Sequence, residues 1–150
     1  MKEIYYTYNN EAIASCIFLS VLQKVGSMDM ARSCLILPFL LDDKTVAYLK
    51  NYHTSSGGLQ EVMSEERRLF TSFNKRYLAL LPVSINALIL LSKGGQITIE
   101  KQILNNSTLD LSKADFGNRF NSVQQAIPNF LTLLGNLSTV QLYQTLKIQL

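Results

Sequence analysis

A pair of glycines, Gly94 and Gly95, divides the most informative stretch of this chain. The ten residues before the pair, 84–93, are mainly apolar and fit one short helix that begins at Ser84, a good capping residue type. Pro82 is expected to end the preceding helix, because proline lacks the N–H that a helix interior needs. Gly94 stands where helices commonly end in a left-handed residue. The sequence therefore predicts a separate helix over 84–93.

Apolar and polar residues alternate after the glycine pair, which predicts a strand over 96–104 with one buried face. Asn105-Asn106 then predicts a turn, and 107–111 a returning strand. A helix that leads directly into such a ribbon is typical of a winged-helix unit. We expect this unit at about 84–112, within a winged-helix-like part of the chain that spans 64–112.

The predicted helix over 84–93 lacks the side chains that read DNA. A recognition helix presents Arg, Lys, Asn or Gln to base edges in the major groove. After Ser84, the only polar residues here are Asn86, Ser92 and Lys93. A helix that is apolar nearly all round is expected to be buried all round. We therefore interpret it as a packing helix, either in the core of the chain or beneath a partner protein.

The charge content of the chain is compatible with a covered surface. Charged residues make up 17% of the sequence and hydrophobic residues 47%, whereas an average soluble domain has about 25% charged residues. Low charge favours either an apolar surface that another protein covers or a compact domain with a large core. The net charge of +3 is scattered and forms no stripe, so the electrostatic footprint of a nucleic-acid binder is weak.

The chain has the length of one domain, 1–150, without an internal repeat or linker. Its two cysteines, Cys16 and Cys34, lie in apolar helical stretches and lack metal-ligand spacing, which is typical of reduced thiols in the cytoplasm. The longest apolar stretches, 12–22 and 35–41, are shorter than the roughly 20 residues of a membrane span. We therefore expect a cytoplasmic protein that does not cross a membrane.

Most of the remaining chain is predicted to form helices joined by short turns. Their expected ranges are 9–25, 30–41, 44–51, 64–81, 113–127, 129–134 and a last helix capped by Ser138. A Ser- and Gly-rich loop is expected over 52–58. Together with the ribbon, these helices predict a mainly α fold with a small β-hairpin, of the α+β class.

The sequence displays no pattern of a catalytic or cofactor-binding site. His53, the only histidine, has no Cys or carboxylate within three residues. Neither glycine pair continues into the Lys-Ser/Thr of a phosphate-binding loop. The acidic pairs Asp42-Asp43 and Glu65-Glu66 fall at helix starts, where the helix dipole favours them. We expect no enzyme, no metal and no cofactor.

The last helix is one candidate for contact with a partner protein. Leu142, Tyr143 and Leu146 are apolar positions at the spacing of helices that bind in grooves. A terminal helix usually docks on its own domain, however. Both roles remain open for these three residues.

A basic cluster is the second candidate. Arg67, Arg68, Lys75 and Arg76 lie close together along one predicted helix. They could contact phosphate or an acidic protein surface, although such residues more often form a solvated face. Four charges are few beside those of a typical nucleic-acid site.

Several short motifs follow one another along the chain. They are Tyr8-Asn-Asn-Glu11 before an apolar helix, Leu37-Pro-Phe-Leu-Leu41, Phe73 with Arg76 before a break, an apolar helix running into Gly-Gly-Gln-Ile, and Leu134-Gly135 before the final Tyr143…Leu146 helix. Their order and spacing resemble the middle component of three-component ABC systems, over Tyr8 to Ile148. The chain departs from that pattern at 136–139, where the family often has an aromatic-rich stretch.

The resemblance implies a subunit of a bacterial conflict or anti-phage complex, of which Lamassu is an example. The middle component is then expected to be a non-catalytic adaptor between an effector, often a nuclease, and an SMC/Rad50-like ABC ATPase. The complex would then contact DNA mainly through the ATPase. The alternative from the residues is a small winged-helix DNA-binding regulator, against which the apolar helix 84–93 argues.

Overall fold

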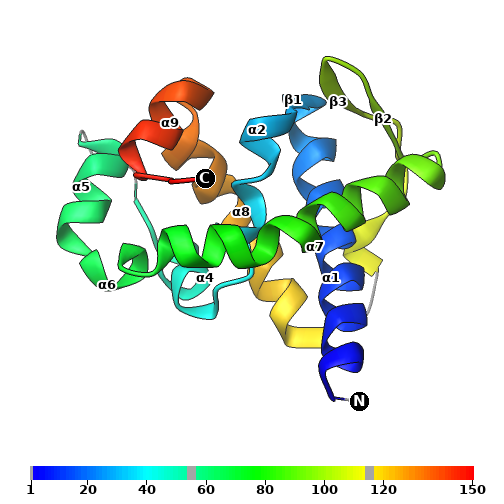
Figure 1. The fold of residues 1–150 in the computed structure, drawn as a ribbon, viewed down its shortest axis with the longest axis horizontal. Helices are drawn as coiled ribbons and strands as arrows, with labels where there is room; N and C mark the ends of the chain where they lie inside the picture. The colour runs from blue at the N-terminus through cyan, green and yellow to red at the C-terminus, as the bar shows by residue number, and fades with distance from the viewer. Residues whose placement is uncertain (1, 54–56, 114–116) are drawn as a thin grey trace.

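Two long helices, α1 (Lys2–Val25) and α7 (Phe73–Lys93), cross one another and organise the fold (Figure 1). Helix α1 ends at Gly26, whose positive φ of 80° is readily adopted only by glycine. The computed structural model describes the backbone of residues 2–53, 57–113 and 117–150, and the side chains of 11–53, 57–112 and 117–150.

The other helices pack around this pair. Within the described residues they are α2 (Met30–Ser33), α3 (Ile36–Leu40), α4 (Asp43–Lys50), α5 (Gly58–Glu65), α6 (Arg67–Phe70), α8 (Gly117–Leu134), α9 (Thr139–Thr145) and a 3-10 turn, η1 (Leu111–Lys113). The predicted mainly α fold with a small β element is confirmed. Parts of the predicted 52–58 loop and of the predicted helix start near 113 lie outside the described residues.

Helix α3 lies at the centre of the core. All five of its residues are buried, as expected for a segment that is apolar on every side. The Phe39 ring packs against Phe73 of α7 and Phe130 of α8, with centroids 4.9 and 5.3 Å apart. One hydrophobic cluster includes residues from α1, α3, α7, α8 and α9, so these five helices share a core.

The β element is a three-stranded antiparallel sheet with the order β1-β3-β2, formed by β1 (Ser27–Asp29), β2 (Ile97–Ile99) and β3 (Gln102–Asn105). The predicted strand over 96–104 is wrong, because it contains both β2 and β3 and the reversal between them. The predicted returning strand over 107–111 is also wrong. There, Ser107 N–H donates to the Asn105 side chain and Leu109 N–H to the Ser107 hydroxyl, which makes local turns.

Helix α7 runs through Pro82, so the predicted helix start at Ser84 is wrong. Ser84 is buried, and its hydroxyl has no hydrogen-bond partner. Pro82 lies on the solvent side, where it removes one helical hydrogen bond, to the Leu78 carbonyl, while packing against α1 and α3 continues on the other side. Helix α8 passes through Pro128 in the same way. A 21-residue helix that crosses α1 replaces the short helix expected in the winged unit, and the winged-helix unit is not confirmed.

Candidate interaction surface

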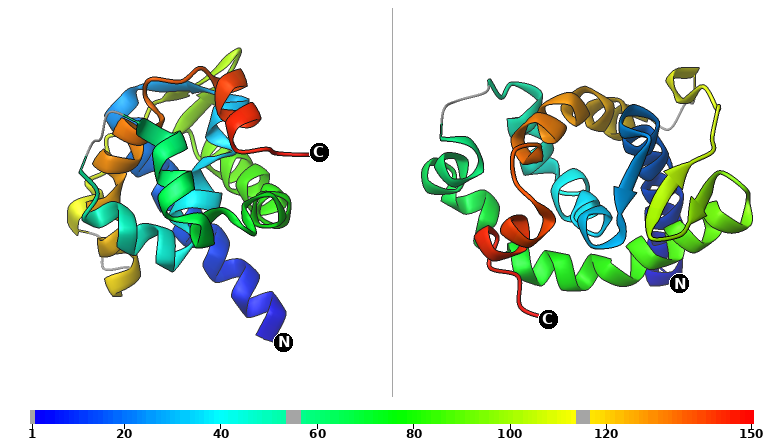
Figure 2. Two further views of the ribbon diagram at one scale, coloured as in Figure 1. Left: turned by 90° about the vertical axis from the view of Figure 1, so that its left-hand side faces the viewer. Right: turned by 90° about the horizontal axis from the view of Figure 1, so that it is seen from above.

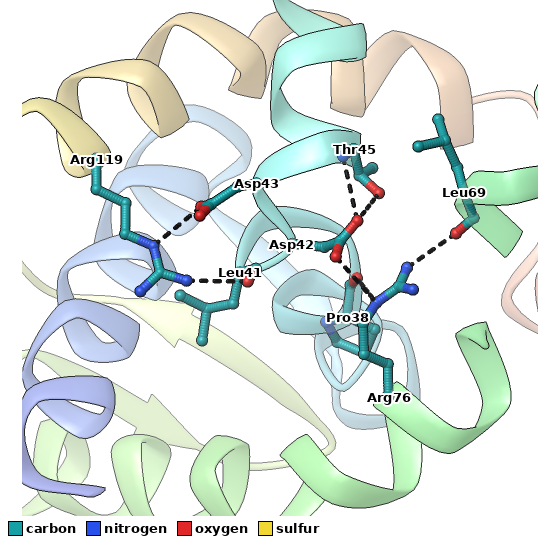
Figure 3. A network of polar contacts seen from close by, with 8 residues as sticks. All are labelled: Pro38, Leu41, Asp42, Asp43, Thr45, Leu69, Arg76 and Arg119. Carbon is teal, nitrogen blue, oxygen red and sulfur yellow. Dashed lines mark hydrogen bonds and ion pairs between the residues drawn. The ribbon is translucent and has the colours of Figure 1, made fainter. Parts of the chain in front are cut away.

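The start of α4 holds a polar network that joins this helix to α3, α6, α7 and α8 (Figure 3). Asp42 caps α4, because its Oδ2 accepts hydrogen bonds from the Thr45 backbone N–H at 3.2 Å and from the Thr45 hydroxyl at 2.6 Å. Asp43 follows in the first turn and accepts a hydrogen bond from Arg119 Nε of α8 at 3.2 Å. Arg119 also donates to the Leu41 carbonyl at 3.0 Å. The predicted helix-start role of this acidic pair is confirmed.

Arg76 of α7 completes the network from the opposite side. Its Nε donates to the Pro38 carbonyl at 3.1 Å, and its Nη2 to the Leu69 carbonyl at 3.2 Å. The guanidinium also reaches within 4.0 Å of Asp42 and lies 5.2 Å from the centroid of the Phe73 ring. Burial lowers the pKa of Arg76, and the Asp42 charge opposes that shift. The side chain therefore ties α3, α6 and α7 together.

The four residues of the predicted basic cluster do not share one surface. Arg67 and Arg68 of α6 and Lys75 of α7 are exposed, whereas Arg76 points into the network. Glu65 and Glu66 directly precede the two exposed arginines in the sequence, so acidic groups accompany them. Arg67 and Arg68 therefore belong to a mixed charge pattern of the kind that surface residues usually make, and Lys75 stands apart from them on α7.

Leu142 of α9 and Leu146, directly after it, lie inside their own chain, with exposed fractions of 0% and 4%. Tyr143 between them is partly buried. Its hydroxyl donates to the Ala31 carbonyl and accepts a hydrogen bond from the Tyr77 hydroxyl at 3.0 Å. Burial raises the pKa of Tyr143. Of the two roles left open by the sequence, these contacts correspond to covering the chain's own core.

Two polar residues, Asp29 and Arg32, fasten α9 and the end of α8 to α2. Asp29 caps α2 through the Arg32 N–H at 2.7 Å and accepts a second hydrogen bond from the Thr139 hydroxyl at 2.6 Å. The Arg32 guanidinium donates to the Leu134 and Leu137 carbonyls at 2.6 and 2.9 Å. The sequence indicates Asp29 as a cap, but its bond to Thr139 and the role of Arg32 carry no local signal.

An apolar groove, here called the α9 groove, opens on the outer side of α9. It has a volume of about 420 Å³ and is lined by Ala31, Thr139, Val140, Tyr143, Ile148 and Leu150, among others. Val140 is 67% exposed. The tail after α9 lies against the first turn of α7, because Gln149 N–H donates to the Asn74 side chain at 2.8 Å.

Helix α7 presents a second, longer apolar surface to solvent. It forms one edge of the molecule, with most of the other helices on one side of it (Figure 2). Its nine exposed residues, here called the α7 face, are Lys75, Leu78, Ala79, Pro82, Ile85, Asn86, Ile89, Leu90 and Lys93. Six of the nine are apolar, so the expected burial on all sides is wrong within this chain.

Helix α7 is also the one helix in the described part of the chain that is long and apolar enough to cross a membrane. Core helices of soluble proteins often share this length and composition. The segment does not form an uninterrupted apolar stretch in the sequence, because Pro82, Ser84 and Asn86 lie within it.

The described residues contain no group of three or more His, Cys, Asp or Glu side chains that could hold a metal ion. Both cysteines carry free thiols. Burial raises the pKa of Cys16 and of Cys34, which disfavours the reactive thiolate. His53 is exposed beyond the end of α4.

The family model described as ABC-three component (ABC-3C) system Middle Component 3 matches residues 2–150. No curated protein and no solved structure shows a significant match to the chain. The resemblance drawn from the order of short motifs is therefore confirmed at the level of the family. Membership in a multi-component system implies partner subunits, which gives the exposed apolar surfaces a context. The chain belongs to the middle component 3 family of ABC-three component systems.

Proposed function

We propose that this protein is a non-catalytic adaptor that bridges an SMC/Rad50-like ABC ATPase and an effector such as a nuclease. The complex would be a cytoplasmic bacterial defence system against phages or plasmids, of the Lamassu type. The family supports the existence of partner subunits. The observation that supports the adaptor role is the α7 face, an apolar surface that stays exposed to solvent although the opposite side of the same helix is buried in the core.

A bridging subunit needs two places of contact, and the chain offers two. The α7 face extends along the helix, whereas the α9 groove is a hollow next to the last helix. Contiguous exposed apolar patches are uncommon on monomeric proteins and mark interaction sites. We assign one partner to each surface, which is the simplest arrangement for a bridge.

The DNA-binding alternative has weaker support. Arg76 is engaged by two carbonyls, and Arg67 and Arg68 directly follow Glu65 and Glu66 in the sequence. The exposed side of α7 offers Lys75, Asn86 and Lys93, but apolar residues separate them. A groove-reading helix would instead place polar side chains along its whole contact.

The test is to express the chain with the subunits encoded beside it, with a tag on this subunit only, and to analyse the eluate by size exclusion. Co-elution of both an ATPase and an effector, in a complex that needs this chain, is the expected result. Elution of this chain alone would refute the adaptor role. Duplex-DNA binding that weakens steeply with salt would then favour the regulator.

A further inference from the structure

The two ends of the α7 face carry the same charge. Lys75 and Lys93 are 18 residues apart, which is five helical turns, so they stand in line on one side of the helix about 27 Å apart. Neither belongs to an ion pair of the described residues. Helix α7 contains no Asp or Glu. Glu11 of α1 accepts a hydrogen bond from Asn86 of this face at 3.2 Å.

Apolar side chains fill the interval between the lysines. Leu78, Pro82, Ile85 and Ile89 follow one another at spacings of four, three and four residues, so they form one stripe along the helix. Ile85 and Ile89 are 44% and 43% exposed. A stripe of this spacing is the surface into which the side chains of a second helix pack.

We propose that the α7 face binds an amphipathic helix of a partner subunit, one with an apolar stripe and carboxylates about 27 Å apart at its two ends. The proposal rests on the adaptor function above and names the chemistry of one of its partners. Each carboxylate would meet one lysine, while the apolar residues of both helices interdigitate between them. The charges would set the register of the two helices, since opposite charges stabilise one alignment and disfavour shifted ones.

A second copy of this chain is a poor occupant by the same reasoning. Packing two α7 faces antiparallel about their centres would place Lys75 of one copy opposite Lys93 of the other. Parallel packing would place each lysine opposite its own counterpart. Like charges meet at both ends in either case, which disfavours pairing. The charge pattern therefore selects an acidic partner over self-association.

Affinity measurements on the full-length chain with separately purified ATPase and effector subunits test the proposal. The variants are Ile85→Asp, Ile89→Asp and the double variant Lys75→Glu with Lys93→Glu. Each should weaken binding to one of the two subunits at least about tenfold, because each places negative charge on a desolvated or acidic contact. Lys75→Arg with Lys93→Arg should retain the wild-type affinity. The matched control is Leu109→Asp, which changes a leucine that is 53% exposed elsewhere on the surface. It should leave both affinities unchanged.

Because all these side chains are exposed, the variants should fold, and thermal unfolding checks this. The identity of the occupant comes from a benzophenone amino acid placed at Ile89 in the assembled complex, followed by sequencing of the cross-linked peptide. A peptide with the apolar spacing of an amphipathic helix and acidic residues near both ends supports the proposal.

Four results would overturn it. A cross-link to a second copy of this chain would assign the face to self-association. Flotation of the chain with phosphatidylserine vesicles, lost in Ile85→Asp, together with unchanged subunit affinities would assign it to a membrane. A complex that assembles normally with every α7 variant would refute the α7 site and leave the adaptor function standing. Failure of the wild-type chain to bind either subunit would instead refute both.

Discussion

Replacing Arg76 by methionine should destabilise the protein by about 3 kcal/mol. The change keeps an unbranched apolar stem but leaves the Pro38 and Leu69 carbonyls without their donor. Hydrogen bonds from charged groups contribute about 1.5–3 kcal/mol each. We take the lower end for both bonds, because the side chain is 21% exposed and water can partly replace it. The weak 4.0 Å contact with Asp42 adds little.

Urea unfolding at neutral pH measures the effect, and thermal unfolding should show a fall in Tm of about 6–12 °C for a chain of this size. Arg68→Met is the matched control, because Arg68 is an exposed neighbour in the same basic cluster. It should change stability by no more than about 0.5 kcal/mol. Arg76→Lys should fall between the two, since an ammonium group lacks the planar fork that reaches both carbonyls.

A loss below about 1 kcal/mol for Arg76→Met would refute this reasoning. It would mean that water satisfies the two carbonyls equally well and that Arg76 does not fasten α7 to α3 and α6. Arg76 would then be available to a ligand, as the sequence-based cluster of four basic residues suggested. Equal losses in Arg68→Met and Arg76→Met would point to a general effect of removing positive charge.

Three further predictions test the core and its polar groups. Leu142→Ala should reduce the free energy of unfolding by about 2–5 kcal/mol, because it empties a fully buried site, whereas Val140→Ala on the same helix should change it by under about 0.5 kcal/mol. Equal, small losses in urea unfolding would show that α9 is not packed on the core. Ser84→Ala should stabilise the protein by about 1 kcal/mol, since it removes a buried hydroxyl without a partner; a Tm below that of the wild type would contradict this. Because the pKa of Tyr143 is raised on folding, its stabilising effect is fully present below about pH 10, the pKa of an unfolded tyrosine, and declines as pH rises above it. The free energy of unfolding, measured from pH 8 to 11, should therefore fall less steeply with pH in Tyr143→Phe than in the wild type. An unchanged slope would exclude this tyrosine as the cause of the fall.

The sequence predicts well where local chemistry decides the structure. Asp42 and Ser138 each cap a helix as expected, and Ser138 forms a full capping box with Gln141. Each of these features depends on a few neighbouring residues, so the pattern alone is sufficient.

Prediction from the sequence fails where contacts between distant segments determine the structure. Pro82 and Pro128 would break isolated helices, but packing on the buried sides holds α7 and α8 together across them. Strand β1 has three residues and forms only because β3 lies beside it. The exposure of Ile85 and Ile89 could not be predicted from the sequence either, because the side of an apolar helix that is covered depends on where α1 crosses it. For the same reason the sequence could not choose between core and interface for Leu142 and Leu146.

The pairing of β1 with β3 has a consequence for the order in which the chain can fold. Met28 pairs with Ile103, about 75 residues later, so the sheet closes a long loop, and such non-local contacts slow folding. At about 5–20 residues per second, translation would leave β1 without its neighbour for roughly 4–15 s after it is made. The β2–β3 hairpin, by contrast, can form as soon as it is synthesised. The apolar sides of α1 and α3 pack on α7 and α8, which are also made later, so they too are exposed early on the ribosome, and this interval is when a chaperone would be most useful.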